Sequence, residues 1–487
     1  MALGISPEAI VEKGNYRLLV KANHWQRIPL SDVATVQNGF AFKSEFFDRE
    51  RGLPLIRIRD ITKSETEHKF NGAYDASFVV RNGNILIGMD GDFTVARWQG
   101  EDALLNQRVC RIRVKSDGYD EKFLLIVLQP YLNAIHAETS SVTVKHLSSR
   151  TIGEIPLPLP PTQEQHRIVA KIETLFSEMD KGIESLKTAR EQLKIFRQAL
   201  LKHAFEGKLT TEWREQNKDK LVTARQLLTN ASQNIGAQLK APSSWIVYRV
   251  EDVLILGPSN GRSVKDRKGG FPVLRLTALK GGKIDLSESK SGDWSRDEAQ
   301  AYIVKEGDFL LSRGNGSKHL VGRGGVVPKH EDEVAYPDTI VRLRVNPELI
   351  LIKFFSLLWE SRVLRDQIEA ASQTTAGIYK INQGHIKAFA VPVPTLTEQQ
   401  LIVRELEEKM SLIDHQLHDV DLAIAASETL RQSILKKAFS GQLVPQDPND
   451  EPASALLARI QTEKDSLLAK PKTPVKRTTK ANSNKAS

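Results

Sequence analysis

Apolar residues recur every three or four positions along two long stretches of the chain, and neither stretch contains a proline. In the first stretch, residues 163–206, the repeating positions are Ile168, Ile172, Leu175, Met179, Leu186, Ala189, Leu193, Phe196 and Leu200. In the second stretch they are Ile402, Leu406, Ile413, Val420, Ala423, Leu430 and Ile434, with polar interruptions. A 3.5-residue spacing sustained over this length predicts coiled-coil helices of about 65 Å.

The two stretches also begin and end alike. An apolar strand closes in prolines at 158–160 and at 392–394, where a hydrogen-bonded ladder cannot continue. A Thr then precedes Glu-Gln, which is typical of a helix start, and Gly207 and Gly441 stand where helices end. One such helix alone would be typical of a chain that dimerises. Two matched helices in one chain predict that they pair with each other, antiparallel.

The similarity of the two stretches is part of a longer repeat. With an offset of 234 residues, 152–209 aligns with 386–443 without a gap, and 19 of the 58 positions are identical. The segments before them correspond more loosely, through strand-like runs separated by glycine-rich turns. The matching runs are 25–36 with 245–256, 52–61 with 270–279, 83–88 with 307–312, and 109–114 with 340–345. The pattern predicts a tandem duplication.

We therefore expect an α+β fold, a tandem duplication of a mixed α/β domain and a long helix. The two helices pair as an antiparallel coiled coil, and the fold has pseudo-two-fold symmetry. The expected order is an N-terminal extension (1–22), a first α/β domain (23–155), a helical region (156–210), a connector with a short helix (211–239), a second α/β domain (240–389), a second helical region (390–444), a C-terminal helix (445–469) and a disordered basic tail (470–487).

Composition narrows the class and the location of the protein. The 487 residues are 40% hydrophobic and 26% charged, as in ordinary soluble domains. One cysteine, Cys110, excludes an internal disulfide framework and a cysteine-rich zinc site. The chain shows neither a signal peptide nor an apolar run of about 20 residues, so we expect a cytoplasmic protein without a membrane partner.

The net charge of +9 hints at an acidic partner, but most of it lies in one place. Residues 470–487 hold six basic and no acidic residues, so the rest of the chain carries only +3. The segment 387–469 holds 8 basic and 13 acidic residues, a net −5. A nucleic-acid hypothesis therefore needs better support than the isoelectric point.

Catalytic motifs are missing from the sequence. It contains no phosphate-binding P-loop, no His-Glu-x-x-His and no Gly-x-Ser-x-Gly, and Leu159-Pro160-Pro161 lacks the acid or amide that would precede two prolines in an amino-methyltransferase site. Isolated histidines such as His146 and His319 are more often structural than catalytic. A duplicated enzyme would show its site twice, so the sequence predicts a chain without catalytic or metal residues.

Polar residues instead recur in glycine-rich loops and on strands at equivalent places in the two halves. Arg57 and Arg59 alternate on an expected strand, which would put both on one face. Asn, Arg and Lys are the side chains that read base edges or contact phosphates in DNA. The DNA-binding candidates are Asn38, Lys43, Arg57, Arg59, Arg97 and Lys145 in the first half, and Asn260, Arg262, Arg275, Arg313, Asn315, Lys318 and Lys380 in the second. Each of these residues alone is better explained as a solvated surface residue, and the hypothesis depends on the whole set, whose loops occupy equivalent places in the two copies while differing in sequence.

The chain resembles the specificity subunit of type I restriction–modification systems. The resemblance rests on SSVTVKHLSSRTIGEIPLPLPPTQEQHRIV and the long helix that ends RQALLKHAFEGKL, together with their second edition, TTAGIYKINQGHIKAFAVPVPTLTEQQLIV to AFSGQL. It covers about residues 22–465. The resemblance implies that each α/β domain is a target recognition domain that reads one half of a bipartite, asymmetric site in double-stranded DNA.

The same resemblance implies the partners and the cofactors. The paired helices set the spacer and dock two methyltransferase subunits, and restriction–translocase subunits join the complex. S-adenosylmethionine, ATP and magnesium belong to the partner subunits, and this chain binds none of them. Two other readings stay open: a coiled-coil scaffold that displays two protein-binding domains without any DNA role, and a nuclease or methyltransferase with a degenerate motif.

Overall fold

The computed structural model describes residues 5–139, 146–221, 239–375 and 377–469. Lys145 and the basic tail, 470–487, lie outside the described residues. The chain divides into two compact units, residues 1–184 with 424–487 and residues 185–423. Each unit contains one α/β domain and a part of each of the two long helices.

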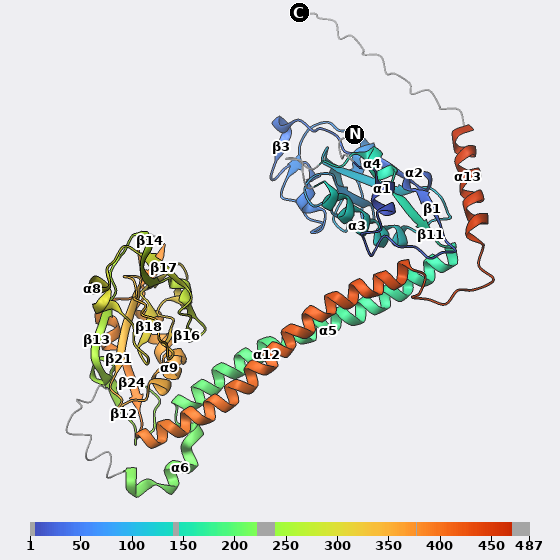
Figure 1. The fold of residues 1–487 in the computed structure, drawn as a ribbon. Helices are drawn as coiled ribbons and strands as arrows, with labels where there is room; N and C mark the ends of the chain where they lie inside the picture. The colour runs from blue at the N-terminus through green and yellow to red at the C-terminus, as the bar shows by residue number, and fades with distance from the viewer. Residues whose placement is uncertain (1–4, 140–145, 222–238, 376, 470–487) are drawn as a thin grey trace, which may run out of the picture. The chain divides into compact units, whose positions relative to one another are not determined.

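The long helices are α5 (Thr162–Phe205) and α12 (Leu396–Phe439), close to the expected bounds. In the second unit, two ion pairs join the helices: Arg190 with Asp421, and Arg197 with Asp414. The residue number rises by seven along α5 while it falls by seven along α12. In the first unit, Arg431 bonds Asp180 and stacks over the ring of Phe176 at 4.5 Å. The helices therefore run antiparallel, as predicted (Figure 1).

The expected pairing positions are mostly buried, and many of them also pack against an α/β domain. Ile168, Ile172 and Ile434 belong to the core of the first unit, with Leu175 and Met179 packed on it. Leu200, Ile402, Leu406 and Ile413 belong to the core of the second unit, with Leu193 packed on it, and Leu186 and Val420 are half-buried. The apolar face of each long helix thus packs against the other helix and also against an α/β domain.

Two expected apolar positions are wrong. Leu430 is 52% exposed and Phe196 is 55% exposed. Near Leu430, half-buried Arg431 occupies the helix face instead, because its guanidinium covers Phe176 while its charge meets Asp180. A heptad count assigns that face to the leucine, since it weighs apolar side chains alone.

The first domain is built from short strands around a four-stranded sheet. The strand order is β2-β10-β7-β8, with every neighbouring pair antiparallel. A five-stranded sheet lies beside it in the order β3-β5-β4-β9-β6. The bounds are β2 (Ala34–Asn38), β3 (Phe47–Asp48), β4 (Leu53–Ile56), β5 (Lys69–Phe70), β6 (Val79–Val80), β7 (Ile85–Gly88), β8 (Val95–Arg97), β9 (Ala103–Leu105) and β10 (Val109–Val114).

The second domain repeats this plan. Its main sheet has the order β13-β21-β18-β20-β16-β15, and its first four strands match the four-stranded sheet of the first domain in order. Their bounds are β13 (Leu254–Asn260), β21 (Ile340–Val345), β18 (Phe309–Ser312), β20 (Gly324–Val326), β16 (Lys283–Ile284) and β15 (Leu279–Lys280). The smaller sheets are β14 (Asp266–Leu274) with β17 (Ser289–Gly292), and β19 (Gly314–Asn315) with β23 (Ile378–Lys380) and β22 (Gln373–Thr375).

Helices cover each main sheet and connect it to a long helix. In the first domain α3 (Glu121–Glu138) packs with the sheet, and in the second α9 (Ile352–Glu360) and α10 (Arg362–Ala371) take its place. Two-stranded ladders join the start and the end of each domain: β1 (Gln26–Pro29) with β11 (Pro156–Leu159), and β12 (Ile246–Arg249) with β24 (Ala390–Val393). The element-by-element match confirms the tandem duplication and the mixed α/β fold class.

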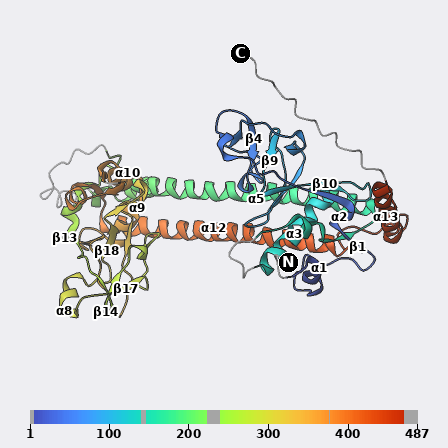
Figure 2. The same cartoon turned by 90° about the horizontal axis from the view of Figure 1, so that it is seen from above.

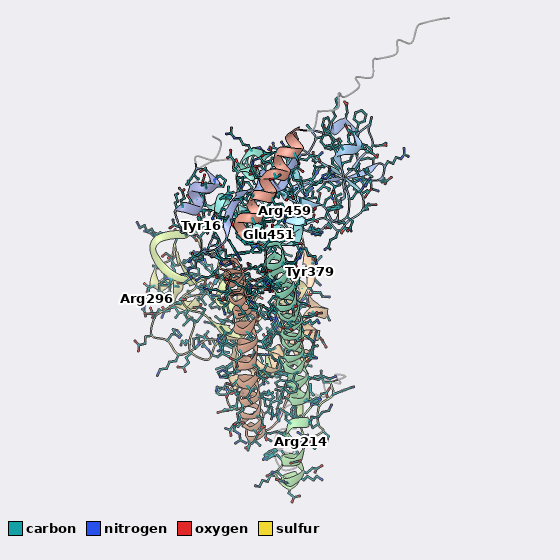
Figure 3. The ribbon with its side chains drawn as sticks, turned by 90° about the vertical axis from the view of Figure 1, so that its right-hand side faces the viewer. Tyr16, Arg214, Arg296, Tyr379, Glu451 and Arg459 are labelled. Carbon is teal, nitrogen blue, oxygen red and sulfur yellow. The ribbon has the colours of Figure 1, made fainter. Side chains whose placement is uncertain are left out.

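The C-terminal helix expected within 445–469 is α13 (Ala453–Ala469), and it packs on the first domain (Figure 2). Leu456 and Ile460 enter the core, and Lys464 pairs with Asp32 at 2.7 Å. On the same helix, Arg459 bonds Glu451 at 3.0 Å (Figure 3). Over the described ranges, no helix is long and apolar enough to span a bilayer.

Candidate nucleic-acid interface

The first domain has a hollow of about 650 Å³ at one end of its main sheet. It forms where the chain leaves β7, where it enters β10 and where it turns after β4. We call this set of residues the first hollow: Arg57, Ile58, Arg59, Thr62, Asp90, Gly91, Asp92, Thr94, Asn106 and Arg108. Three arginines and two aspartates give it a mixed lining that is polar and ionic.

Arg57 and Arg59 meet in this hollow, although not in the predicted way. The prediction that both lie on one strand is wrong, because β4 ends at Ile56 and Ile58–Asp60 form a 3-10 turn. The carboxylate of Asp60 accepts the Arg57 backbone N–H at 2.9 Å, which caps the turn and ends the strand. The Arg59 guanidinium lies 3.2 Å from His68 Nε2. Burial, and then the charges of Arg57 and Arg59, lower the pKa of His68.

The other candidates of the first domain lie apart from the hollow. Asn38 ends β2, where its amide donates to the Ser149 hydroxyl at 3.2 Å. Lys43 pairs with Glu45 at 3.5 Å in an exposed turn, and Arg97 on β8 lies 3.7 Å from Glu121. Lys145 cannot be placed, since it lies outside the described residues.

The second domain has a smaller hollow, about 320 Å³, at the equivalent place. We call its lining the second hollow: Leu276, Leu279, Gly281, Gly282, Ser312, Asn315, Leu320, Arg323, Gly324 and Glu360. The turn after β14 and the segment after β18 build it, as the turn after β4 and the segment after β7 build the first. Its lining residues differ in kind, with one arginine, Arg323, held by Glu360.

The structure brings most second-domain candidates to one end of the main sheet. Gly314 pairs with Lys380 across β19 and β23, and Ile381 N–H bonds the carbonyl of Arg313 at 3.0 Å. Asn315 lies on the same short strand, and Lys318 is exposed three residues on. Asn260 ends β13, the edge strand on the other side of β21.

Two further candidates are exposed on separate turns. Arg262 follows β13 and is solvent-exposed. Arg275 precedes the 3-10 turn Leu276–Ala278, just as Arg57 precedes its turn, and its Nε donates to the Ser289 carbonyl at 3.3 Å. The equivalent arginines therefore begin equivalent turns in the two domains.

Sequence reasoning missed several lining residues. Asp90, Asn106 and Arg108 line the first hollow, and Ser312 and Arg323 line the second. A usable signal was present, since these residues flank the strands 85–88, 109–114, 309–312 and 324–326. The ion pairs that hold them, however, are distant in the sequence: Arg108 and Asp90 are 18 positions apart, and Arg323 and Glu360 are 37 apart.

Equivalent arginines are buried within the two sheets and do not face a ligand. Arg111 and Arg342 occupy matching positions on β10 and β21 and are 1% and 8% exposed. Burial lowers the pKa of Arg111 to about 10, and its guanidinium bonds the carbonyls of Ser77 and Val79. Arg342 lies over the Tyr336 ring at 5.1 Å. These side chains support the sheets and present no charge to the hollows.

No metal centre stands out in the part of the chain that the structure describes, where no group of three or more His, Cys, Asp or Glu side chains is placed to hold an ion. The hollows hold donors and acceptors suited to polar contacts. They hold no nucleophile with an adjacent base among the residues that line them.

Comparison with known proteins places the chain in a family. The family model of the type I restriction modification DNA specificity domain matches twice, at residues 23–188 and 242–417. The type I restriction enzyme EcoBI specificity subunit of Escherichia coli is 33% identical over 483 residues, which cover 95% of this chain and 97% of that protein. The EcoKI specificity subunit of Escherichia coli K12 is 26% identical over 90% of this chain and 95% of its own length.

Solved structures share the fold. A chain of a type I R-M system aligns with a TM-score of 0.61 and 17% identity, over 87% of this chain and 99% of its own. The crystal structure of the HsdS subunit from Thermoanaerobacter tengcongensis aligns with a TM-score of 0.50, over 86% and 98%. With two matching family domains, a relative of 33% identity along nearly the whole length and the duplicated layout, the chain belongs to the type I restriction–modification specificity subunits.

Proposed function

We propose that this chain is the sequence-specific DNA-recognition subunit of a type I restriction–modification complex, and that it has no catalytic role of its own. Each α/β domain reads one half of a bipartite, asymmetric site. One observation carries the proposal: two domains with the same strand order present hollows at the same place, but the residues that line them differ. Two domains that share a backbone scaffold but differ in the residues that line their hollows are suited to recognise two different DNA sequences.

Contacts with DNA are divided between the hollows and their surroundings. Arg57 and Arg59 at the first hollow, and Arg313, Lys318 and Lys380 near the second, supply positive charge for phosphates and donors for base edges. Asn315 has an amide suited to a base or a phosphate. The other described candidates would contact DNA from outside the hollows: Asn38, Lys43 and Arg97 in the first domain, and Asn260, Arg262 and Arg275 in the second.

Methyltransferase subunits are proposed to dock on the paired helices. The helix parts of the second unit expose four large apolar side chains, Ile195, Phe196, Leu412 and Leu422, at 55% or more. A hollow of about 490 Å³ opens between the same helix parts, lined by Ala189, Gln192, Leu193, Phe196, Gln416, Asp419 and Val420. Exposed apolar area of this kind on a helix pair suits an apolar protein partner.

The remaining assignments follow from that assembly. Two methyltransferase subunits and restriction–translocase subunits complete the complex in the cytoplasm, and they bring S-adenosylmethionine, ATP and magnesium. The paired helices set the spacer between the two half-sites. The excess of only +3 outside the tail implies that partner subunits supply part of the phosphate contact.

The test is to express the chain with its partner subunits and to sequence the DNA of those cells for methylated positions. The expected result is one bipartite motif with two different halves and an unspecified spacer. The purified complex should bind a duplex with that motif with a steep dependence on salt. Loss of all sequence preference in the complex would favour the scaffold reading, and methyl transfer by this chain alone would refute the non-catalytic role.

A further inference from the structure

Asp90 holds the side chains of Arg108 and His146 at the rim of the first hollow. Its Oδ2 accepts a hydrogen bond from Arg108 Nη1 at 2.7 Å, and its Oδ1 accepts one from His146 Nδ1 at 2.7 Å. Backbone contacts tie the same three residues together. Asp90 forms a β-bridge with His146, and Met89 N–H bonds the Arg108 carbonyl at 2.9 Å. These backbone contacts therefore fix the position of the Arg108 main chain, from which the side chain extends.

The burial of the pair shows which partner faces outward. The Arg108 side chain is 53% exposed and the Asp90 side chain is 20% exposed, so the carboxylate is recessed and the guanidinium stands forward. Over the described residues, Asp90 is the sole side-chain partner of that guanidinium. One of its five N–H donors is thus engaged, and the side chain is oriented while it keeps donors for a ligand.

Charge decides what kind of acceptor suits such an arginine. A phosphate brought to Arg108 would also approach the Asp90 carboxylate, and the exposed Asp92 lines the same hollow. Repulsion between these anions offsets part of the gain at Arg108, which is bonded to Asp90, while Arg57 and Arg59 in the same hollow remain to meet a phosphate. An uncharged base edge with two acceptors avoids this repulsion and can still accept two hydrogen bonds from the Arg108 guanidinium. The major-groove edge of guanine, with O6 and N7, is the base edge that matches an arginine fork.

We propose that Arg108, oriented by Asp90, is a specificity-determining residue that reads one guanine in the half-site of the first domain. The inference rests on the proposed function and deepens it by naming a residue and a base. Asp90 and His146 act as positioning residues, since they hold the guanidinium without meeting the base.

The second domain shows that this contact is confined to one half of the site. The equivalent backbone bond there joins Arg313 N–H to the Thr339 carbonyl at 2.9 Å, so Thr339 stands in the place of Arg108. Gly314, the residue after Arg313, stands in the place of Asp90. With neither the arginine nor the carboxylate, the second domain cannot form the pair.

The experiment uses the complex of this chain with its methyltransferase partners and duplexes that carry the methylated motif. Each guanine of each half-site is replaced in turn by 7-deazaguanine, which lacks the N7 acceptor but keeps base pairing. Four variants are compared with the wild type: R108A, R108K, D90N and K13A. The Lys13–Glu138 pair is a matched control, since its 2.8 Å length and its exposures of 44% and 21% resemble those of Arg108–Asp90, yet it lies outside the hollow.

We expect one guanine in one half-site at which 7-deazaguanine weakens wild-type binding. A complete bidentate contact is worth roughly 5- to 150-fold, and loss of N7 removes a part of it. R108A should become insensitive to that replacement, R108K should recover little of it, and K13A should behave as the wild type. D90N should lose discrimination at the same guanine while binding unrelated DNA as well as or better than the wild type, because a negative charge is gone. Unchanged responses at the other positions of the same half-site show that the first domain of each variant folds.

Two results would overturn the proposal. If R108A weakens binding equally to all duplexes and lowers the salt slope by about one, the residue contacts a phosphate. If R108A keeps the wild-type response at every guanine, it reads no base. A wild-type complex that prefers no sequence at all would instead refute the proposed function, so the two failures are distinguishable.

Discussion

Gln165 and Gln399 make the same three hydrogen bonds at the starts of the two long helices. Gln165 accepts the N–H of Asp120 at 2.8 Å and donates to the carbonyls of Pro160 and Gly118 at 2.9 and 3.0 Å. Gln399 accepts the N–H of Leu351 at 2.8 Å and donates to the carbonyls of Pro394 and Leu349, both at 2.9 Å. Both side chains are fully buried, so each joins a long helix to its own α/β domain.

Replacing either glutamine with alanine should lower the free energy of unfolding by about 3 kcal/mol, because three buried backbone groups lose their partners. Q165E should do as badly, since a carboxylate cannot donate to two carbonyls. Urea unfolding followed by circular dichroism measures the loss. The control is Q163A, an exposed position on the same helix, and a similar loss there would contradict the role given to Gln165.

A buried ion pair forms a second junction in the second unit. Arg214 Nη1 lies 2.7 Å from Glu398 Oε1, and the two side chains are 14% and 0% exposed. Arg214 is labelled in Figure 3. R214A should cost about 3–5 kcal/mol, because Glu398 would remain buried without its counter-charge. R362A breaks the exposed pair with Asp366 and should cost at most about 0.5 kcal/mol. Equal thermal stabilities of the two variants would show that burial does not strengthen the junction.

The sequence predicts the long elements well and the local geometry poorly. The bounds of α5 and α12 and the strands at 85–88 and 109–114 follow from periodicity, because hydrophobic spacing reports directly on regular structure. The turn after Arg57 was not predicted, because it depends on a single hydrogen bond from the Arg57 N–H to the Asp60 carboxylate.

The candidate site was predicted only in part, for a related reason. Asp90 follows β7 and Arg108 precedes β10, and the pairing of these two strands brings the side chains together. The register of strand pairing is a non-local property, so it cannot be predicted from the local sequence. Residue type alone identifies Arg57 and Arg59 as candidates. It does not show that Arg108, which lies in no motif of the sequence, shares their hollow.

Cys110, the one cysteine of the chain, offers a probe of the first domain. It lies on the central strand β10 with no exposed surface, and burial raises the pKa of its thiol to about 12. In the folded protein its reaction with a thiol reagent should therefore be slow at pH 7–9, since both access and thiolate are lacking. Reaction should become fast only in denaturant. Rapid labelling of the native chain, rising about tenfold per pH unit as for a free thiol, would show that β10 opens.

Exchange of the second domain tests the independence of the two readers. Replacing residues 240–386 with the same segment of another specificity subunit should change one half of the methylated motif and leave the other half intact. The expectation follows because each domain has its own core and its own hollow. The methylated motif of cells that carry the exchanged chain measures the outcome, and a change in both halves would mean that the domains read DNA together.

Lengthening the paired helices tests their role in spacing. Seven residues inserted between Arg190 and Arg197, matched by seven between Asp414 and Asp421, add about 10 Å of helix and leave the apolar register nearly unchanged. The spacer of the methylated motif should grow by about three base pairs, while both half-sites stay the same.

An insertion in α5 alone should instead weaken assembly, because the two arginine–aspartate pairs would fall out of register. A matched insertion of two residues is the control, since it turns the apolar face by about 200° and should fail to assemble. If the seven-residue variant methylates the original motif, the helices do not set the spacer.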